Sequence, residues 1–159
     1  MTSATVLTNA GNLTSAEYLA NRVREAYSGL NGDHLGDLQA LESLYSKDIS
    51  FEDPSHAIQG RGALMDYFHK RVAGLDTCQF RFHRTVINGT DLFLSWTLSF
   101  AHPRLNAGQL IRVEGASYLR SRNGQVYYHR DYFDLGAMLY ENLPLLGRVI
   151  RRVKPTFGS

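Results

Sequence analysis

Four consecutive segments in the second half of the chain alternate apolar and polar residues and are rich in aromatic and β-branched side chains. This pattern is typical of β-strands. Short turn sequences rich in asparagine and glycine separate the segments and favour tight hairpins. We therefore expect an antiparallel four-stranded meander, formed by residues 79–87, 92–101, 110–119 and 126–134.

The first half of the chain has helical periodicity instead. Thr14 and Glu17 form a capping-box pattern, and apolar residues at spacings of three and four follow it. A second helical face precedes a short strand at 49–53, and a third follows Gly60. The three faces comprise Leu19, Val23, Ala26, Tyr27 and Leu30, then Leu38, Leu41, Leu44 and Tyr45, then Leu64, Tyr67, Phe68, Val72 and Leu75.

Helices followed by a meander predict the α+β class, with three N-terminal helices packed on one strongly curved, mostly antiparallel sheet. A short C-terminal helix is expected at 135–143, with Asp134 as its N-cap and Pro144 at its end. The expected organisation is a flexible N-terminus at 1–13, one domain at 14–147 and a basic C-terminal tail at 148–159.

Composition narrows the class of protein. Apolar residues make up 43% and charged residues 20%, as in ordinary globular domains. The single cysteine, Cys78, excludes an intrachain disulfide and a multi-cysteine zinc site, and the histidines lack metal-ligand spacing. No segment approaches the about 18 apolar residues of a membrane span, and the N-terminus lacks the features of a secretory signal. We therefore expect a cytoplasmic protein without a metal site.

The net charge of +2 has a local origin. Four basic residues gather near the C-terminus, namely Arg148, Arg151, Arg152 and Lys154. Because the rest of the chain has no basic excess, nucleic acid is not expected as a partner. Residues 148–154 could touch a membrane surface or an acidic partner, although a solvated helix end packed on the domain is the favoured interpretation.

The strand at 92–101 has two unlike faces. One carries Leu92, Leu94, Trp96, Leu98 and Phe100, and the other carries Phe93, Ser95, Thr97, Ser99 and Ala101. The large face could pack on a second subunit or on the helices, and the small face could line a cavity because small side chains leave volume unfilled. We expect a symmetric homodimer through the sheet.

The last strand is the richest in chemistry. Alternation places Tyr127, His129, Asp131 and Phe133 on one face. A carboxylate among aromatic side chains is costly to ionise, which suits Asp131 to proton transfer. A structural ion pair with an arginine or histidine is the alternative, and spacing alone favours it.

Two further side chains are candidates. Alternation puts Asp53 on the same face as Phe51, although an aspartate before Pro54 is also typical of a turn. Tyr27 lies on the apolar face of the first helix, where its hydroxyl could donate to a developing oxyanion or belong to the core.

The order of elements, Glu52-Asp53-Pro54 and the run from His129 to Leu135 together resemble the nuclear transport factor 2-like superfamily, in its SnoaL-like branch. The resemblance covers about residues 14–147 and implies a cone-shaped α+β fold. The last-strand run is similar to that of limonene epoxide hydrolase, whose catalytic acid falls on Asp131.

Not every functional position of these relatives is matched. The arginine and second aspartate of the epoxide hydrolase fall on Thr97 and Ser99, so hydrolysis by that mechanism is not expected. Its water-holding tyrosine and asparagine fall on Phe51 and Asp53.

The ketosteroid isomerases and the SnoaL-like polyketide cyclases match other positions. The isomerase resemblance implies a general base at Asp53 and an oxyanion-hole tyrosine at Tyr27. Its second oxyanion donor falls near Gly115 or Ala116, with Glu114 one position away. The cyclase resemblance implies a single acid–base aspartate at Asp131.

Our hypothesis from the sequence is a cofactor-independent isomerase or cyclase that acts on a hydrophobic carbonyl compound in an apolar pocket. Asp53 is the predicted base, Asp131 the acid or second shuttle, Tyr27 the oxyanion donor, and His129 the residue that orients Asp131. The predicted pocket residues are Phe51, Thr97, Ser99, Gly115 and Phe133. The alternative is a non-catalytic ligand-binding or dimerisation module of the same fold.

Overall fold

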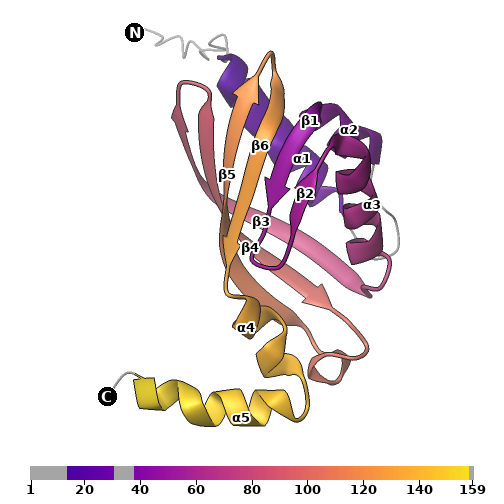
Figure 1. Cartoon of the computed structure of the whole chain (residues 1–159), viewed down its shortest axis with the longest axis vertical. Coiled ribbons are helices and arrows are strands. Elements are labelled where there is room, and N and C mark those ends of the chain that lie inside the picture. Colours follow the sequence, from indigo (N-terminus) through magenta and orange to yellow (C-terminus); the bar gives the residue numbers. More distant parts are fainter. Residues whose placement is uncertain (1–13, 31–37, 158–159) are drawn as a thin grey trace, which may run out of the picture.

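The computed structural model of the chain describes residues 14–30 and 38–157 (Figure 1). The predicted flexible segment 1–13 lies outside the described residues. The helices are α1 (Ser15–Ser28), α2 (Leu38–Leu44), α3 (Arg61–Val72), α4 (Leu135–Met138) and α5 (Leu146–Val153). The strands are β1 (Tyr45–Glu52), β2 (Ala57–Gln59), β3 (Thr77–Asn88), β4 (Asp91–Ala101), β5 (Ile111–Arg122) and β6 (Gln125–Phe133). Short 3₁₀ turns are η1 (Asn106–Gly108), η2 (Tyr140–Asn142) and η3 (Lys154–Phe157).

The strands form one mixed sheet in the order β2-β1-β6-β5-β4-β3. All neighbouring strands are antiparallel except β1 and β6, which are parallel. Strands β3 to β6 are the predicted meander, which the structure confirms, and the sheet is not closed into a barrel. Helices α1, α2 and α3 lie together on one side of it (Figure 1). The α+β class and the cone-like arrangement are therefore confirmed.

Two helix starts follow from local sequence. At α1, the Thr14 hydroxyl accepts from the backbone N–H of Glu17 at 3.2 Å, and the Glu17 carboxylate accepts from the backbone N–H of Thr14 at 2.8 Å. At α4, Asp134 Oδ1 accepts from the backbone N–H of Ala137 at 3.0 Å. Both caps are as predicted, because these short oxygen acceptors satisfy N–H groups that lack a partner within the helix.

Strand β4 turns its large face towards the helices. Leu92, Leu94, Trp96 and Phe100 are buried on that side, whereas Phe93 on the other face is 44% exposed. The large face thus packs on the helices of this chain, which is one of the two arrangements predicted for it. The homodimer through the sheet stays a prediction.

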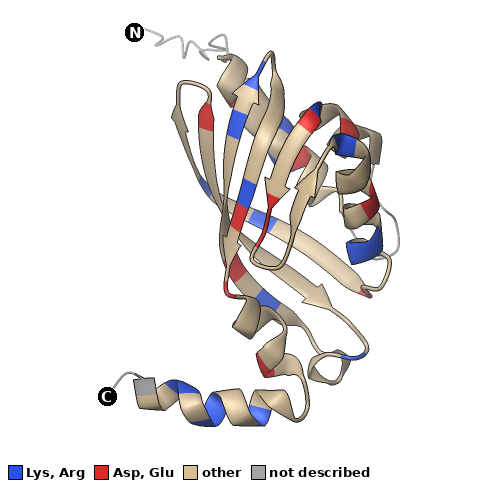
Figure 2. Ribbon diagram, viewed as in Figure 1, with Lys and Arg blue, Asp and Glu red and all other residues tan. Residues whose placement is uncertain are grey.

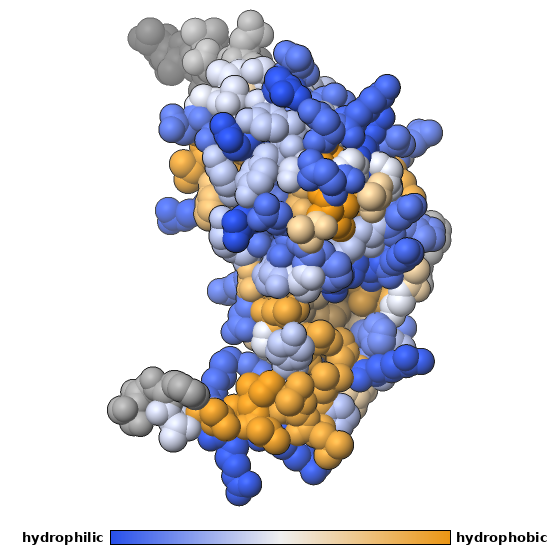
Figure 3. All heavy atoms as spheres, in the orientation of Figure 1, coloured by the Kyte–Doolittle hydropathy of each residue, from blue (hydrophilic) through white to orange (hydrophobic). Residues whose placement is uncertain are grey.

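Helix α5 extends from the end of the sheet domain (Figure 1). Its apolar residues Leu146, Val149 and Val153 are exposed, and Figure 3 shows hydrophobic surface gathered over α4 and α5. Arg148, Arg151 and Arg152 are spread along the same helix (Figure 2). Contacts to η2 and α4 hold the helix: Arg151 donates to the Glu141 carbonyl at 2.7 Å, and Lys154 contacts the carboxylates of Glu141 and Asp134.

None of the helices in the described residues combines the length and the apolar character that a membrane span needs. The membrane-surface contact considered for 148–154 stays a prediction.

Candidate functional site

A cavity of about 550 Å³ lies on the helix-covered side of the sheet. Its wall draws on α1, α3, α4 and five of the strands and is mainly apolar, with Phe51, Phe68, Phe80, Trp96 and Phe133 among the contributors. The polar groups in this wall include Tyr27, Asp53, Tyr67 and Asp131. A small number of polar groups in an apolar concavity is the usual composition of a small-molecule site.

Asp131 is held by two side chains of the sheet. The Ser117 hydroxyl donates to Asp131 Oδ1 at 2.6 Å, and His129 Nε2 lies 2.7 Å from the same oxygen. Ser117 is the cross-strand partner of Asp131 in the β5–β6 register, which explains its position. Trp96 Nε1 donates to Ser117 Oγ at 2.9 Å, so the serine hydrogen points towards the carboxylate.

The hydrogen bonds continue behind Asp131 into the core. His129 Nδ1 lies 2.9 Å from Tyr45 Oη, and Tyr45 Oη lies 2.5 Å from Tyr27 Oη. Burial, helped by the neighbouring Tyr45 and the charge of Asp131, raises the pKa of Tyr27 well above its ordinary value. Burial likewise raises the pKa of Tyr45, against a hydrogen bond from Tyr27 that lowers it. Both phenols are therefore neutral at neutral pH.

Asp53 also lines the cavity, but its oxygens are already occupied. Oδ1 accepts from the backbone N–H groups of Ser55 and His56, both at 2.7 Å, and from the Ser55 hydroxyl at 2.9 Å. Oδ2 accepts from the Tyr67 hydroxyl, and Arg71 Nη2 lies 3.7 Å away. Burial acts to raise the pKa of Asp53, but the hydrogen bonds from Tyr67, Ser55 and His56 outweigh it and lower that pKa. This is the geometry of a turn-forming aspartate.

Four of the five predicted pocket residues fall in two groups. Phe51 and Phe133 line the cavity. Thr97 and Ser99 do not belong to its wall in the described structure: Thr97 Oγ1 lies 2.7 Å from His83 Nε2 on the opposite face of β4. Because successive side chains of a strand point to opposite faces, Thr97 and Ser99 lie on the small face of β4 and, contrary to the prediction, do not line this cavity.

Gly115 lies directly beneath the Trp96 ring. A Cβ atom at this position would be 2.3 Å from Trp96 Cη2, so only glycine lets the ring lie against β5. Gly115 shares the cavity side of β5 with Val113 and Ser117, whereas Glu114 is exposed on the other side and pairs with Thr97. Gly115, near which a second oxyanion donor was expected, therefore holds the Trp96 ring in place.

Two members of the site were not singled out from sequence. Tyr45 was assigned to a helical face, but it is the first residue of β1, and its hydroxyl reaches His129. Ser117 is opposite Asp131 only because β6 contains one extra residue between two stretches of regular pairing. Alternation from Phe51 back through Ile49 was the available signal, but it ends at the exposed Lys47, where the pairing of β1 with β6 is irregular, and so does not reach Tyr45.

Cys78 lines the cavity, and burial raises the pKa of its thiol to about 11, so it is a neutral thiol.

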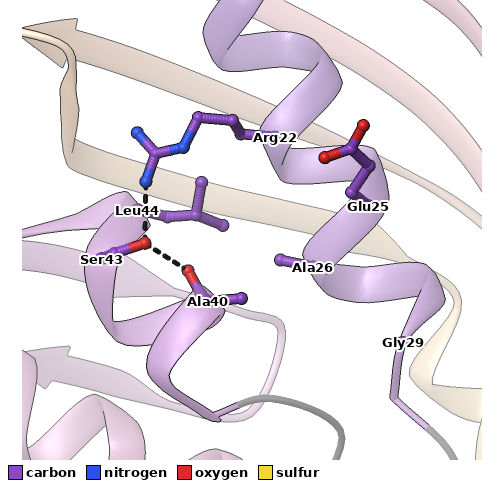
Figure 4. A pocket seen from close by; sticks show the side chains of 7 residues that line it. All are labelled: Arg22, Glu25, Ala26, Gly29, Ala40, Ser43 and Leu44. Atoms are coloured by element: carbon purple, nitrogen blue, oxygen red, sulfur yellow. Dashed lines mark hydrogen bonds between the residues drawn. The ribbon is translucent and has the colours of Figure 1, made fainter.

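A smaller cavity of about 180 Å³ lies between α1 and α2, where Arg22 donates to Ser43 Oγ at 2.7 Å (Figure 4). Among residues 14–30 and 38–157, no three His, Cys, Asp or Glu side chains are grouped so as to hold a metal ion.

The family model of the SnoaL-like domain matches residues 23–129. The chain belongs to the SnoaL-like family. No curated protein matches its sequence significantly. The SnoaL-like match confirms the resemblance found in the sequence motifs, and it spans Tyr27, Tyr45, Asp53 and Ser117, with His129 as its last residue.

Solved structures share the fold of this SnoaL-like chain. A candidate SnoaL-like polyketide cyclase from Jannaschia sp. CCS1 is 14% identical, with a TM-score of 0.70 over 82% of this chain and 95% of that one. A hypothetical protein with a ketosteroid isomerase-like fold from Catenulispora acidiphila, in complex with trimethylamine, is 18% identical, with a TM-score of 0.66 over 79% and 93%. An LEH-like epoxide hydrolase from M. tuberculosis is 17% identical, with a TM-score of 0.64 over 88% and 96%. At these identities the similarity shows the fold alone, and the predicted nuclear transport factor 2-like fold is confirmed.

Proposed function

We propose that this SnoaL-like protein binds a hydrophobic carbonyl compound in its cavity and catalyses proton transfer on it, as in an isomerisation or a cyclisation. The observation that carries the proposal is Asp131, a carboxylate in an apolar wall. Its Oδ1 is fixed by Ser117 and His129, and within the described residues Oδ2 has no hydrogen-bond donor. A positioned carboxylate with one available oxygen is suited to act as general base and then as general acid.

Of the two carboxylates, the geometry favours Asp131 over Asp53 as the proton-exchanging group. Each hydrogen bond to the Asp53 carboxylate stabilises its charged form, and the lowered pKa makes it a weak base. Asp53 instead connects the turn after β1 to Tyr67 on α3, and so shapes the cavity wall.

Deuterium exchange tests the proposal without knowledge of the natural substrate. Ketones of increasing size, with 1-tetralone as the bicyclic member, are incubated with the protein in D₂O, and NMR follows loss of the α-hydrogen. Asp131→Asn should lower the exchange rate about 10²–10⁴-fold. Asp53→Asn is the matched control and should retain most of the rate. An equal loss in both variants would return Asp53 to the mechanism.

A non-catalytic binding module is the second candidate. It is favoured because the polar groups of the cavity wall are already hydrogen-bonded within the protein: Tyr27, Asp53 and Asp131 each have a protein partner. Trp96, the one tryptophan of the chain, lines the cavity and reports on occupancy by its fluorescence. Ketones that quench Trp96 but exchange no hydrogen would support this module and overturn the proposed chemistry.

A further inference from the structure

We propose that four side chains form a proton relay that joins two points of the cavity wall, so that one carboxylate can serve both a carbon and an oxygen of the bound molecule. This inference rests on the proposed proton transfer. The members of the relay, in order, are Tyr27, Tyr45, His129 and Asp131.

The contacts make an unbroken series. The distances are 2.5 Å between the two phenol oxygens, 2.9 Å from Tyr45 to His129, and 2.7 Å from His129 to Asp131. All are within the hydrogen-bond range. The end members Tyr27 and Asp131 line the cavity, whereas the inner members do not.

The inner members are sealed from solvent. Tyr45 and His129 are each 1% exposed. Phe51 packs edge-on to the imidazole at 4.9 Å, and Phe68 and Phe80 pack edge-on to the Tyr27 ring at 5.9 and 5.3 Å. A proton that enters the series at one end can therefore leave only at the other.

The side branch does not divert the proton. Ser117 is hydrogen-bonded to Asp131, but behind it lies the indole N–H of Trp96, which has no acceptor. Ser117 and Trp96 are therefore positioning residues for the carboxylate.

Two arrangements of hydrogens satisfy every member. In the first, Asp131 is ionised and accepts from His129 Nε2–H, Tyr45 donates to Nδ1, and Tyr27 donates to Tyr45. In the second, Asp131 is protonated and donates to Nε2, the imidazole donates from Nδ1 to Tyr45, and Tyr45 donates to Tyr27. The Tyr27 hydrogen then points into the cavity.

The two arrangements interconvert as a carbonyl compound becomes its enol. Starting from the second arrangement, Tyr27 gives its hydrogen to the carbonyl oxygen, and each member receives the hydrogen of the next. Asp131 is then a carboxylate, and it removes the hydrogen from the α-carbon as the C–H electron pair forms the enol double bond. One hydrogen has moved from carbon to oxygen, and Asp131 again carries a hydrogen, now on Oδ2. The relay regains its starting arrangement when this hydrogen moves to Oδ1, the imidazole exchanges its Nε2 hydrogen for one on Nδ1, and both phenol hydroxyls rotate towards the cavity end.

The test monitors the NMR signal of Tyr27 at one end of the relay while Asp131 at the other end is mutated, and it needs no substrate. Tyrosines are labelled with ¹³C at Cζ, and Tyr27→Phe identifies the Tyr27 signal. Asp131→Asn is expected to move the Tyr27 signal in the otherwise native protein. The same change in a Tyr45→Phe background is expected to leave that signal in place, because the connecting hydroxyl is missing.

Tyr67→Phe is the matched control. It removes a tyrosine hydroxyl from the same cavity without touching the relay, so the response to Asp131→Asn should persist. If Asp131→Asn still moves the Tyr27 signal in the Tyr45→Phe background, an electrostatic field through space explains the shift, and the relay is overturned. The relay is also overturned if Asp131→Asn leaves the Tyr27 signal in place in the otherwise native protein.

If Tyr45→Phe does not fold, ¹⁵N spectra of His129 in the native protein test the relay instead. One protonated and one accepting nitrogen support the relay, and a doubly protonated ring overturns it.

The outcome is separable from that of the proposed function. Ketone exchange without coupling between Asp131 and Tyr27 would overturn the relay and leave Asp131 as a simple acid–base group. Coupling without any ketone exchange would overturn the proposed function, and with it the catalytic meaning of the relay.

Discussion

His129 and Asp131 are two residues apart on the same face of β6, and His129 Nε2 lies 2.7 Å from Asp131 Oδ1. Alternation along a strand makes this pairing local, since residues i and i+2 share a face. Because one ring nitrogen meets the carboxylate, the other is directed at Tyr45 in the core. A local spacing thus connects the cavity wall to a buried tyrosine pair.

Gly115→Ala should destabilise the protein by about 1–3 kcal/mol, the usual cost of overpacking a core. The added Cβ would fall 2.3 to 2.7 Å from three atoms of the Trp96 ring, so the indole must move. Urea unfolding measures the loss of stability, and a shifted Trp96 emission maximum reports the displacement. Gly62→Ala on α3, where a Cβ meets nothing within 4 Å, is the control and should cost nothing. Equal stability of both variants would contradict the prediction.

Asp53→Asn should lower the free energy of unfolding at pH 7 by on the order of 1 kcal/mol, as expected for lost hydrogen bonds to a carboxylate. The pKa of Asp53 is lowered in the folded state, so its contribution is present above the unfolded value of about 3.9 and is lost as pH falls through the folded value. The difference in unfolding free energy between Asp53→Asn and the native protein should therefore disappear as the pH falls below 4, as urea titrations can measure.

Asp66→Asn is the control for this measurement. Asp66 is exposed on α3 and has no hydrogen bond or ion pair within the described residues, so its replacement should not change the stability at either pH. A gap for Asp53→Asn that stays constant from pH 7 to pH 3 would count against the carboxylate's role.

Stability should fall steeply in alkali. The pKa of Tyr27 is raised in the folded protein, chiefly by burial, so above about pH 10 the unfolded chain loses a proton that the folded chain keeps. Each such group removes up to about 1.4 kcal/mol of stability per pH unit in that range. Tyr27→Phe should reduce the slope of unfolding free energy against pH between 9 and 11, whereas Tyr140→Phe, at a 40% exposed site, should not. Parallel slopes for native protein and Tyr27→Phe would refute this.

Cys78 should react slowly with iodoacetamide. Its thiol is 6% exposed, and burial raises its pKa to about 11. Since the thiolate is the nucleophile, alkylation at pH 7.5 should be at least about 100-fold slower than that of a free thiol. Mass spectrometry follows the reaction, and the same protein in urea is the control. Labelling at equal rates in both conditions would show an accessible thiolate instead.

Much of the fold was predictable because its signals are local. The asparagine–glycine turns and the alternation of residues 79–134 predicted the meander, and Thr14 and Asp134 predicted two helix starts. Each signal depends on residues a few positions apart, which constrain the backbone directly. The family resemblance rested on equally local runs, around Asp53 and Asp131.

The helix predicted at 135–143 shows where local patterns are insufficient. The structure has α4, which ends at Met138, and the separate turn η2. The Asn142 side chain donates to the carbonyls of Ala137 and Met138 at 2.7 and 3.3 Å, and thus binds carbonyl groups at the end of α4. A side chain that bonds the backbone in this way competes with a continuous helix.

By itself, the sequence determined the three N-terminal helices, the four-stranded meander, their order and the shared face of His129 and Asp131. Only the tertiary structure decided that the large face of β4 lines the cavity, since alternation defines two faces without saying which one the helices cover. It also decided the partner of Asp131. Arg122 pairs with Gln125 and Ser121 with Val126, but Arg120 pairs with Tyr128, so one extra residue in β6 brings Ser117 opposite Asp131. Such register, like the approach of Tyr45 to His129, depends on contacts between distant segments, which no local period specifies.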